Sequence, residues 1–182
     1  LATSCASPIK TGSTKNIPCT IDNATSLTSP FIYKLYTYGT LYATYPSTGT
    51  TTLTSYTFPN VPFNTEQATV TVKLEVTDSC IGNTVGSTTC NVAVENSVLT
   101  TVNVTNPNTC KDTIQVGGAT CQLGYTCIDQ FGAAITCSAP TWTTTAGTGS
   151  VTVSTSGLVT GATAGTATVT ATTGGKSGSI SV

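Results

Sequence analysis

The sequence contains no histidine, no arginine and few charged residues of any kind. Only 7% of its 182 residues are charged and the net charge is -1, whereas about 25% of residues are charged in ordinary globular proteins. Scattered lysines cannot form the basic patch that a nucleic-acid binder needs. Without histidine, a serine or threonine nucleophile lacks its usual general base. The acidic residues are also scattered, and no phosphate-binding, dinucleotide-binding or calcium-binding motif is present, so we predict a non-enzyme without cofactor or metal.

The sequence also lacks any apolar run long enough to span a membrane. No signal peptide is visible and Leu1 is not a methionine, so we expect a mature chain after signal removal or the boundary of a cloned fragment. Charge is missing altogether between Asp129 and Lys176. A chain of this kind needs another source of solvation.

Threonine, which supplies about a quarter of the residues, favours the pleated surface of a β-sheet. The stretch TVTVKLEVT places Val70, Val72, Leu74 and Val76 on one face and polar residues on the other, which is typical of a strand with one wet face. No stretch shows sustained helical periodicity. We therefore predict an all-β fold, with a turn at Tyr38-Gly39.

The even number of cysteines indicates disulfides and an exported, extracellular protein. A zinc site would need paired CxxC knuckles or histidine partners, which the sequence lacks. Four cysteines fall in each half, which supports two separately cross-linked domains, residues 1–98 and 99–182. Each set of four allows three pairings. The pairings we favour are Cys5–Cys19, Cys80–Cys90, Cys110–Cys121 and Cys127–Cys137.

Two regions of the chain resemble known domain families. The segments SYTFPN, ATVTVKLEVTDS and CNVAVEN resemble the last three strands of a PKD-type immunoglobulin-like repeat, which covers residues from about Ile17 to Asn96 but here lacks that family's tryptophan motif. The tail GSVTVSTSGLVTGATAGTATVTATTGGKSGSISV resembles the bacterial immunoglobulin-like group 2 domain, from about Leu99 to Val182. Together these resemblances imply two tandem immunoglobulin-like β-sandwiches, with Trp142 in the second core.

The whole chain resembles the subunits of thin archaeal filaments called threads, from Sulfolobales. This resemblance implies a homopolymer joined head to tail by donor-strand complementation, heavy glycosylation and a role in adhesion. Residues 1–10 would then either complete a sheet in a neighbouring copy or form the first strand of their own domain. The alternative function is a monomeric adhesin fragment or a carbohydrate-binding module of a larger secreted protein.

Two kinds of surface site complete the predictions. Asn23 and Asn103 begin Asn-x-Thr sequences, so they are candidate glycan acceptors, and glycan would supply solvation that charges do not. In the tyrosine-rich segment, strand alternation would place Tyr36 and Tyr38 on one face, where they could contact another subunit or stack on a sugar. Tyrosines of this segment also suit the core and cross-strand aromatic pairs.

Overall fold

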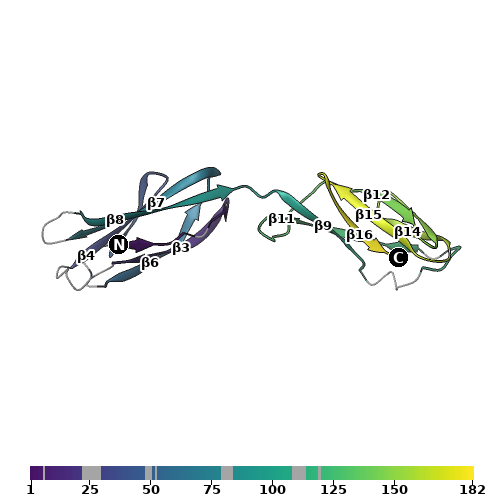
Figure 1. The fold of residues 1–182 in the computed structure, drawn as a ribbon, viewed down its shortest axis with the longest axis horizontal. Coiled ribbons are helices and arrows are strands. Elements are labelled where there is room, and N and C mark those ends of the chain that lie inside the picture. Colours follow the sequence, from purple (N-terminus) through teal and green to yellow (C-terminus); the bar gives the residue numbers. More distant parts are fainter. Residues whose placement is uncertain are drawn as a thin grey trace. The chain divides into compact units, whose positions relative to one another are not determined.

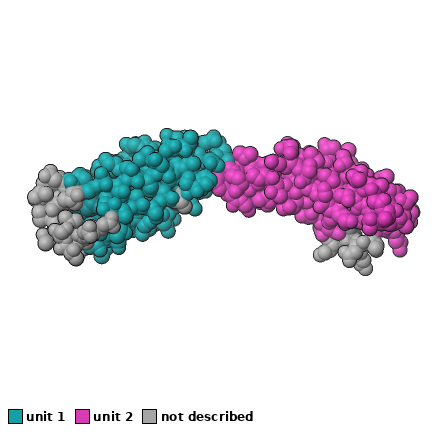
Figure 2. All heavy atoms as spheres, viewed as in Figure 1, with its two compact units in different colours: residues 1–96 teal, residues 97–182 magenta. Residues whose placement is uncertain are grey.

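The computed structural model describes residues 1–5, 7–21, 30–47, 51, 53–78, 84–107, 114–118 and 120–182. The chain divides into two compact units, 1–96 and 97–182, which have different colours in Figure 2. The division lies close to the boundary expected after residue 98. The described residues form β-strands and no helix (Figure 1), so the fold is all-β.

Unit 1 contains two sheets whose neighbouring strands are antiparallel, except that β2 runs parallel to β8. The smaller sheet has the order β1 (Ala2–Thr3), β3 (Ser13–Thr20) and β6 (Ser55–Phe63). The larger sheet has the order β2 (Ile9–Lys10), β8 (Thr84–Glu95), β7 (Gln67–Asp78), β4 (Phe31–Thr37) and β5 (Thr40–Tyr45).

The two sheets of unit 1 enclose one core because apolar residues alternate along their strands. Strand β7 buries Val70, Val72, Leu74 and Val76, which is the face predicted from the sequence. The smaller sheet covers them with Ile17, Cys19, Phe58, Val61 and Phe63. Burying a large apolar side chain stabilises the fold by about 1.5–3 kcal/mol, so this alternation makes unit 1 a β-sandwich.

The hairpin that joins β4 to β5 turns at Tyr38 and Gly39, as predicted. Both residues have positive φ, 50° and 75°. Two positive φ values at the central positions match the right-handed twist of the flanking strands. The turn therefore ends β4 at Thr37 and directs the chain into the edge strand β5.

Unit 2 is a second sandwich. One layer is made of two sheets, β9 (Leu99–Thr105) paired with β11 (Gly124–Asp129), and β10 (Thr120–Gln122), β14 (Leu158–Thr163) and β13 (Ser150–Val153) in that order. The other contains β12 (Thr141–Ala146), β15 (Ala167–Thr173) and β16 (Lys176–Ser181). Only Leu123 separates β10 from β11, so these two act as one strand that pairs first with β14 and then with β9. Four strands facing three is the arrangement of an immunoglobulin constant-type domain.

The core of unit 2 is built from smaller side chains than that of unit 1. Ala167, Val169 and Ala171 alternate inward along β15, as predicted. Trp142 on β12 packs against the buried residues of this core, and its ring lies 6.4 Å from that of Tyr125. The indole therefore fills space that the alanines leave.

The backbones of β16 and β9 approach each other closely at Gly178. A Cβ atom on Gly178 would lie 2.0 Å from the carbonyl oxygen of Val102, which is shorter than any real contact between these atoms. Glycine is required here because a side chain would separate the two strands.

Candidate functional site

A disulfide joins Cys5 to Cys90 on β8, with 5.9 Å between their Cα atoms. The predicted pairings Cys5–Cys19 and Cys80–Cys90 are therefore wrong, although Cys80 itself lies outside the described residues. The predictions favoured cysteines that are close in sequence, whereas the fold brings the N-terminal segment to the last strand of its unit, 85 residues away. Closing a loop of this length stabilises the folded state by about 4–5 kcal/mol in the chain-entropy account.

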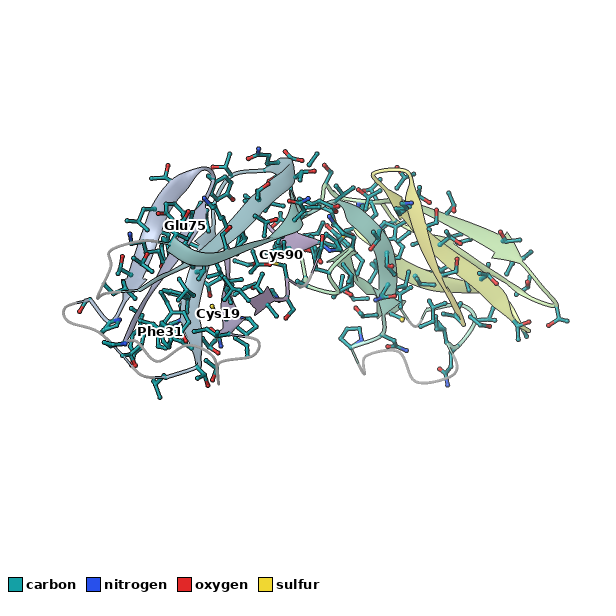
Figure 3. All side chains as sticks on the ribbon, turned by 60° about the vertical axis from the view of Figure 1, so that its left-hand side comes forward. Cys19, Phe31, Glu75 and Cys90 are labelled. Atoms are coloured by element: carbon teal, nitrogen blue, oxygen red, sulfur yellow. A yellow bond between two sulfur atoms is a disulfide. The ribbon has the colours of Figure 1, made fainter. Side chains whose placement is uncertain are left out.

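Cys19 is a buried free thiol in this structure (Figure 3), so the prediction that it is disulfide-bonded is also wrong. Burial raises its pKa to about 11. Tyr33 on β4 is buried as well and its hydroxyl donates a hydrogen bond to the carbonyl oxygen of Leu53. Burial, with a smaller effect of Cys19, raises the pKa of Tyr33 to about 12. Because a nucleophilic cysteine needs a lowered pKa and exposure, Cys19 is structural.

In unit 2 a disulfide joins Cys127 to Cys137, the pairing that we favoured. Between them the chain turns around Asp129, whose side chain is only 2% exposed. Its Oδ1 atom accepts hydrogen bonds from the backbone N–H groups of Phe131 at 2.9 Å and Ala133 at 2.8 Å. Cys121 is also disulfide-bonded, and its predicted partner Cys110 lies outside the described residues.

The N-terminal segment belongs to its own sandwich. Strand β1 pairs with the end of β3 through Ala2 and Thr3, and β2 runs beside β8, with Ile9 buried in the core. The Cys5–Cys90 disulfide fixes the chain between these two strands. Residues 1–5 and 7–10 therefore lie within their own unit in this structure, and pairing of this segment with a neighbouring copy stays a prediction.

The predicted contact residues Tyr36 and Tyr38 lie in different surroundings. Tyr36 projects from the outer face of β4, where its hydroxyl donates to Glu75 Oε2 at 2.8 Å. Tyr38 lies in the turn after β4, where its ring is 6.4 Å from that of Phe63 and its hydroxyl donates to the carbonyl oxygen of Thr65 at 3.2 Å. The expected shared face is absent because β4 ends at Thr37, one residue before Tyr38.

Glu75 on β7, labelled in Figure 3, is the centre of a polar cluster. Its Oε1 atom is 2.5 Å from Lys73 Nζ, and Lys34 lies directly opposite it on β4. The hydrogen bonds from Lys73 and then Tyr36 lower the pKa of Glu75. The same contacts raise the pKa of Lys73 and of Tyr36, so a carboxylate and a neutral phenol persist together here at neutral pH.

This cluster was not predicted as a unit from the sequence. Lys34 and Tyr36, like Lys73 and Glu75, are two residues apart, so alternation places each pair on the outer face of its own strand. That signal was available. The register sets Lys34 opposite Glu75, and Tyr36 opposite Lys73. Neither segment alone predicts this register.

The candidate glycan acceptors remain predictions. Asn103 lies exposed on β9, and Asn23 lies outside the described residues. Hydroxyl groups cover the outer face of β12, β15 and β16, where Thr170 bonds Ser179 and Thr172 bonds Ser177, each at 2.8 Å. These hydroxyls supply hydrogen-bonding groups to water along the chargeless part of the sequence.

The described residues contain no group of three metal-binding side chains and no helix long and apolar enough to cross a membrane. A cavity of about 410 Å³ in unit 2 is lined by residues with uncharged side chains, which include Ile114, Val116, Val151 and Val182. Such a lining offers no general acid or base.

No known family model and no curated protein sequence matches the chain. Several solved structures resemble it. The fibronectin(III)-like modules of Clostridium thermocellum CbhA have 16% identity and a TM-score of 0.38, with 97% of this chain and 86% of that chain covered. The S-layer protein rSbsC(31-844) has 16% identity and a TM-score of 0.37, with 96% and 40% covered, and SbsC domains 4 and 5 have 22% identity and a TM-score of 0.33, with 82% and 68% covered.

Proposed function

We propose that the chain is a structural subunit of an extracellular surface filament that serves in adhesion, and that its copies join by pairing strands at their sheet edges. Disulfides within each unit fit an extracellular protein. The sequence supplies few groups for catalysis, whereas the folded units supply uncharged sheet edges. In this role the protein links copies of itself into a fibre and catalyses no reaction.

One observation carries this proposal, namely the edge strand β5. It lies at the end of the five-stranded sheet, has no charged residue, and leaves Leu41 and Tyr42 exposed by 47% and 43%. Soluble proteins usually protect such edges with lysine, proline or a bulge, because an open edge pairs with other chains. Strand β5 has one of these protections, a bulge at Tyr42, but none of its residues is charged.

A filament needs β5 to pair with a different edge of the next copy. Pairing of two β5 strands would close a dimer, whereas a heterologous contact propagates without end. The edge strand β13 in unit 2 is likewise uncharged, and we assign it as the partner. Residues 1–5 and 7–10 lie in their own sandwich in this structure, so this version of strand complementation does not require the N-terminal segment to move.

Electron microscopy of the native protein tests the proposal. We expect fibres with a regular axial repeat, and we expect Tyr42→Lys to abolish them while the far-ultraviolet circular dichroism stays unchanged. Thr71→Lys is the matched control, because it adds the same charge to an exposed residue of the interior strand β7. Dispersed monomers in native material, or fibres unaffected by Tyr42→Lys, would contradict the proposal.

A second candidate function, a monomeric adhesin or carbohydrate-binding module, is favoured by the exposed cluster around Tyr36. Tyr38 supports it less, because its ring packs on Phe63. Tyr36→Ala should then abolish binding to a glycan array. An unchanged binding profile would count against this function.

A further inference from the structure

Charged residues are rare in this chain, yet three of them meet on the outer face of unit 1. The whole sequence has six basic and seven acidic residues. Lys34, Lys73 and Glu75 are adjacent across β4 and β7. Two ammonium groups therefore face one carboxylate, and the local charge is positive although the chain as a whole is slightly acidic.

An aromatic and an aliphatic side chain continue the same face. Tyr36 lies opposite Lys73 on one side and opposite Leu41 on the other. Lys73 Nζ is 5.4 Å from the centre of the Tyr36 ring. The hydrogen bond from Tyr36 to Glu75 fixes the phenol, and Leu41 is 47% exposed. Across the sheet, from β5 to β7, the outer face therefore carries in turn an aliphatic side chain (Leu41), an aromatic one (Tyr36) and a cationic one (Lys73).

We propose that this lysine–tyrosine face, defined as Lys34, Tyr36, Leu41, Lys73 and Glu75, binds an anionic saccharide. The sulfate or carboxylate group of the sugar pairs with the lysines, and the C–H face of the ring covers Tyr36 and Leu41. Charge complementarity and an adjoining apolar surface fit a ligand that has both properties. Two lysines are too few to follow a nucleic-acid backbone.

Glu75 acts as an internal competitor in this arrangement. It holds Lys73 at 2.5 Å, and a ligand anion must share that lysine with it. Removing the charge of Glu75 while keeping an oxygen acceptor for Tyr36 should strengthen binding. A purely structural role of Glu75 would predict the opposite result, because a substitution that only loosened the cluster would weaken binding of the saccharide.

Isothermal titration of the full chain tests the inference. The probes are a sulfated oligosaccharide with its desulfated counterpart, and an oligouronate with its carboxyl-reduced counterpart. We expect at least one anionic probe to bind at least about tenfold more tightly than its neutral counterpart. The combined Lys34→Gln and Lys73→Gln variant should lose about tenfold in affinity, and Glu75→Gln should gain several-fold.

Two further variants serve as controls, one for the loss of a lysine charge elsewhere and one for a change of side chain that keeps the charge. Lys15→Gln removes the same charge from an exposed residue of β3 in the opposite sheet, and it should leave the affinity unchanged. Lys34→Arg with Lys73→Arg should retain binding. Absence of binding to both anionic probes, equal binding to the neutral probes, or an equal loss with Lys15→Gln would overturn the inference.

This inference rests on the adhesive part of the proposed function and not on polymerisation. Fibres without saccharide binding would remove the inference and leave the filament proposal intact. Saccharide binding by chains that form no fibres would support the inference and remove the filament.

Discussion

Several polar side chains of this protein are buried in defined surroundings rather than exposed. Cys19 and Tyr33 lie in the core of unit 1, and Asp129 lies beneath a hairpin of unit 2. The first two stay neutral because burial opposes their charged forms. Asp129 is instead held by hydrogen bonds from two backbone N–H groups. The Tyr33 hydroxyl also has a backbone partner, the carbonyl oxygen of Leu53, so hydrogen bonds offset the cost of burial in both units.

The raised pKa values of Cys19 and Tyr33 predict that unit 1 loses stability in alkali. Both groups ionise more easily in the unfolded chain, near pH 9.0 and 10.0. Their contribution is complete below those values and falls as the pH rises towards about 11 and 12. Urea unfolding between pH 7 and 11 should show this decline, and Cys19→Ala should make it shallower. In the folded chain at pH 8, iodoacetamide should leave Cys19 unmodified. Rapid alkylation, or Cys19 found in a disulfide by peptide mapping, would refute this account.

Replacing Asp129 should destabilise unit 2. Asp129→Ala removes the acceptor for two backbone N–H groups, so we expect a loss of about 2–4 kcal/mol in the free energy of unfolding. Asp129→Asn keeps one oxygen and should cost less. Thermal unfolding followed by circular dichroism measures both. An Asp129→Ala variant as stable as the parent chain would show that water replaces the carboxylate.

At the scale of strands, periodicity could be predicted and pairing could not. The alternation of β7 identified its buried face because each strand carries that pattern by itself. The split of the N-terminal segment between β1 and β2, and the register that joins Lys34 to Glu75, depend on contacts between distant segments. The Cys5–Cys90 disulfide was missed for the same reason. The cysteines of the Cys127–Cys137 disulfide are ten residues apart, but the same spacing gave the wrong pairing Cys80–Cys90, so spacing alone does not decide a disulfide.

The contact between β9 and β16 should be sensitive to a single methyl group. Gly178→Ala places a Cβ atom on the carbonyl oxygen of Val102, and β9 must move outward. We expect a loss of about 1–3 kcal/mol, as for other overpacked sites. Gly118→Ala is the control, because no atom lies within 4 Å of its added Cβ and its φ is not positive. Equal thermal stability of the two variants would show that β16 adjusts without cost.

At the scale of the whole molecule, each unit has its own core and at least one disulfide within it. The buried cluster of unit 1 contains residues only from that unit, and the two clusters of unit 2 likewise. The Cys5–Cys90 and Cys127–Cys137 bonds each lie within one unit. A chain with so few charges therefore relies on apolar burial and cross-links inside each sandwich.

Separate cores and separate cross-links predict that the two units unfold independently. Replacing Cys5 and Cys90 with alanine should lower the melting temperature of unit 1 by about 15 °C or more, because the disulfide closes a long loop. Replacing Cys127 and Cys137 should lower that of unit 2 by about 10 °C, since its loop is shorter. Differential scanning calorimetry of the full chain measures both transitions, and each pair of variants serves as the control for the other. If one pair of substitutions moved both transitions by the same amount, the units would form a single cooperative structure, and the division at residue 96 would describe the shape of the chain without describing its energetics.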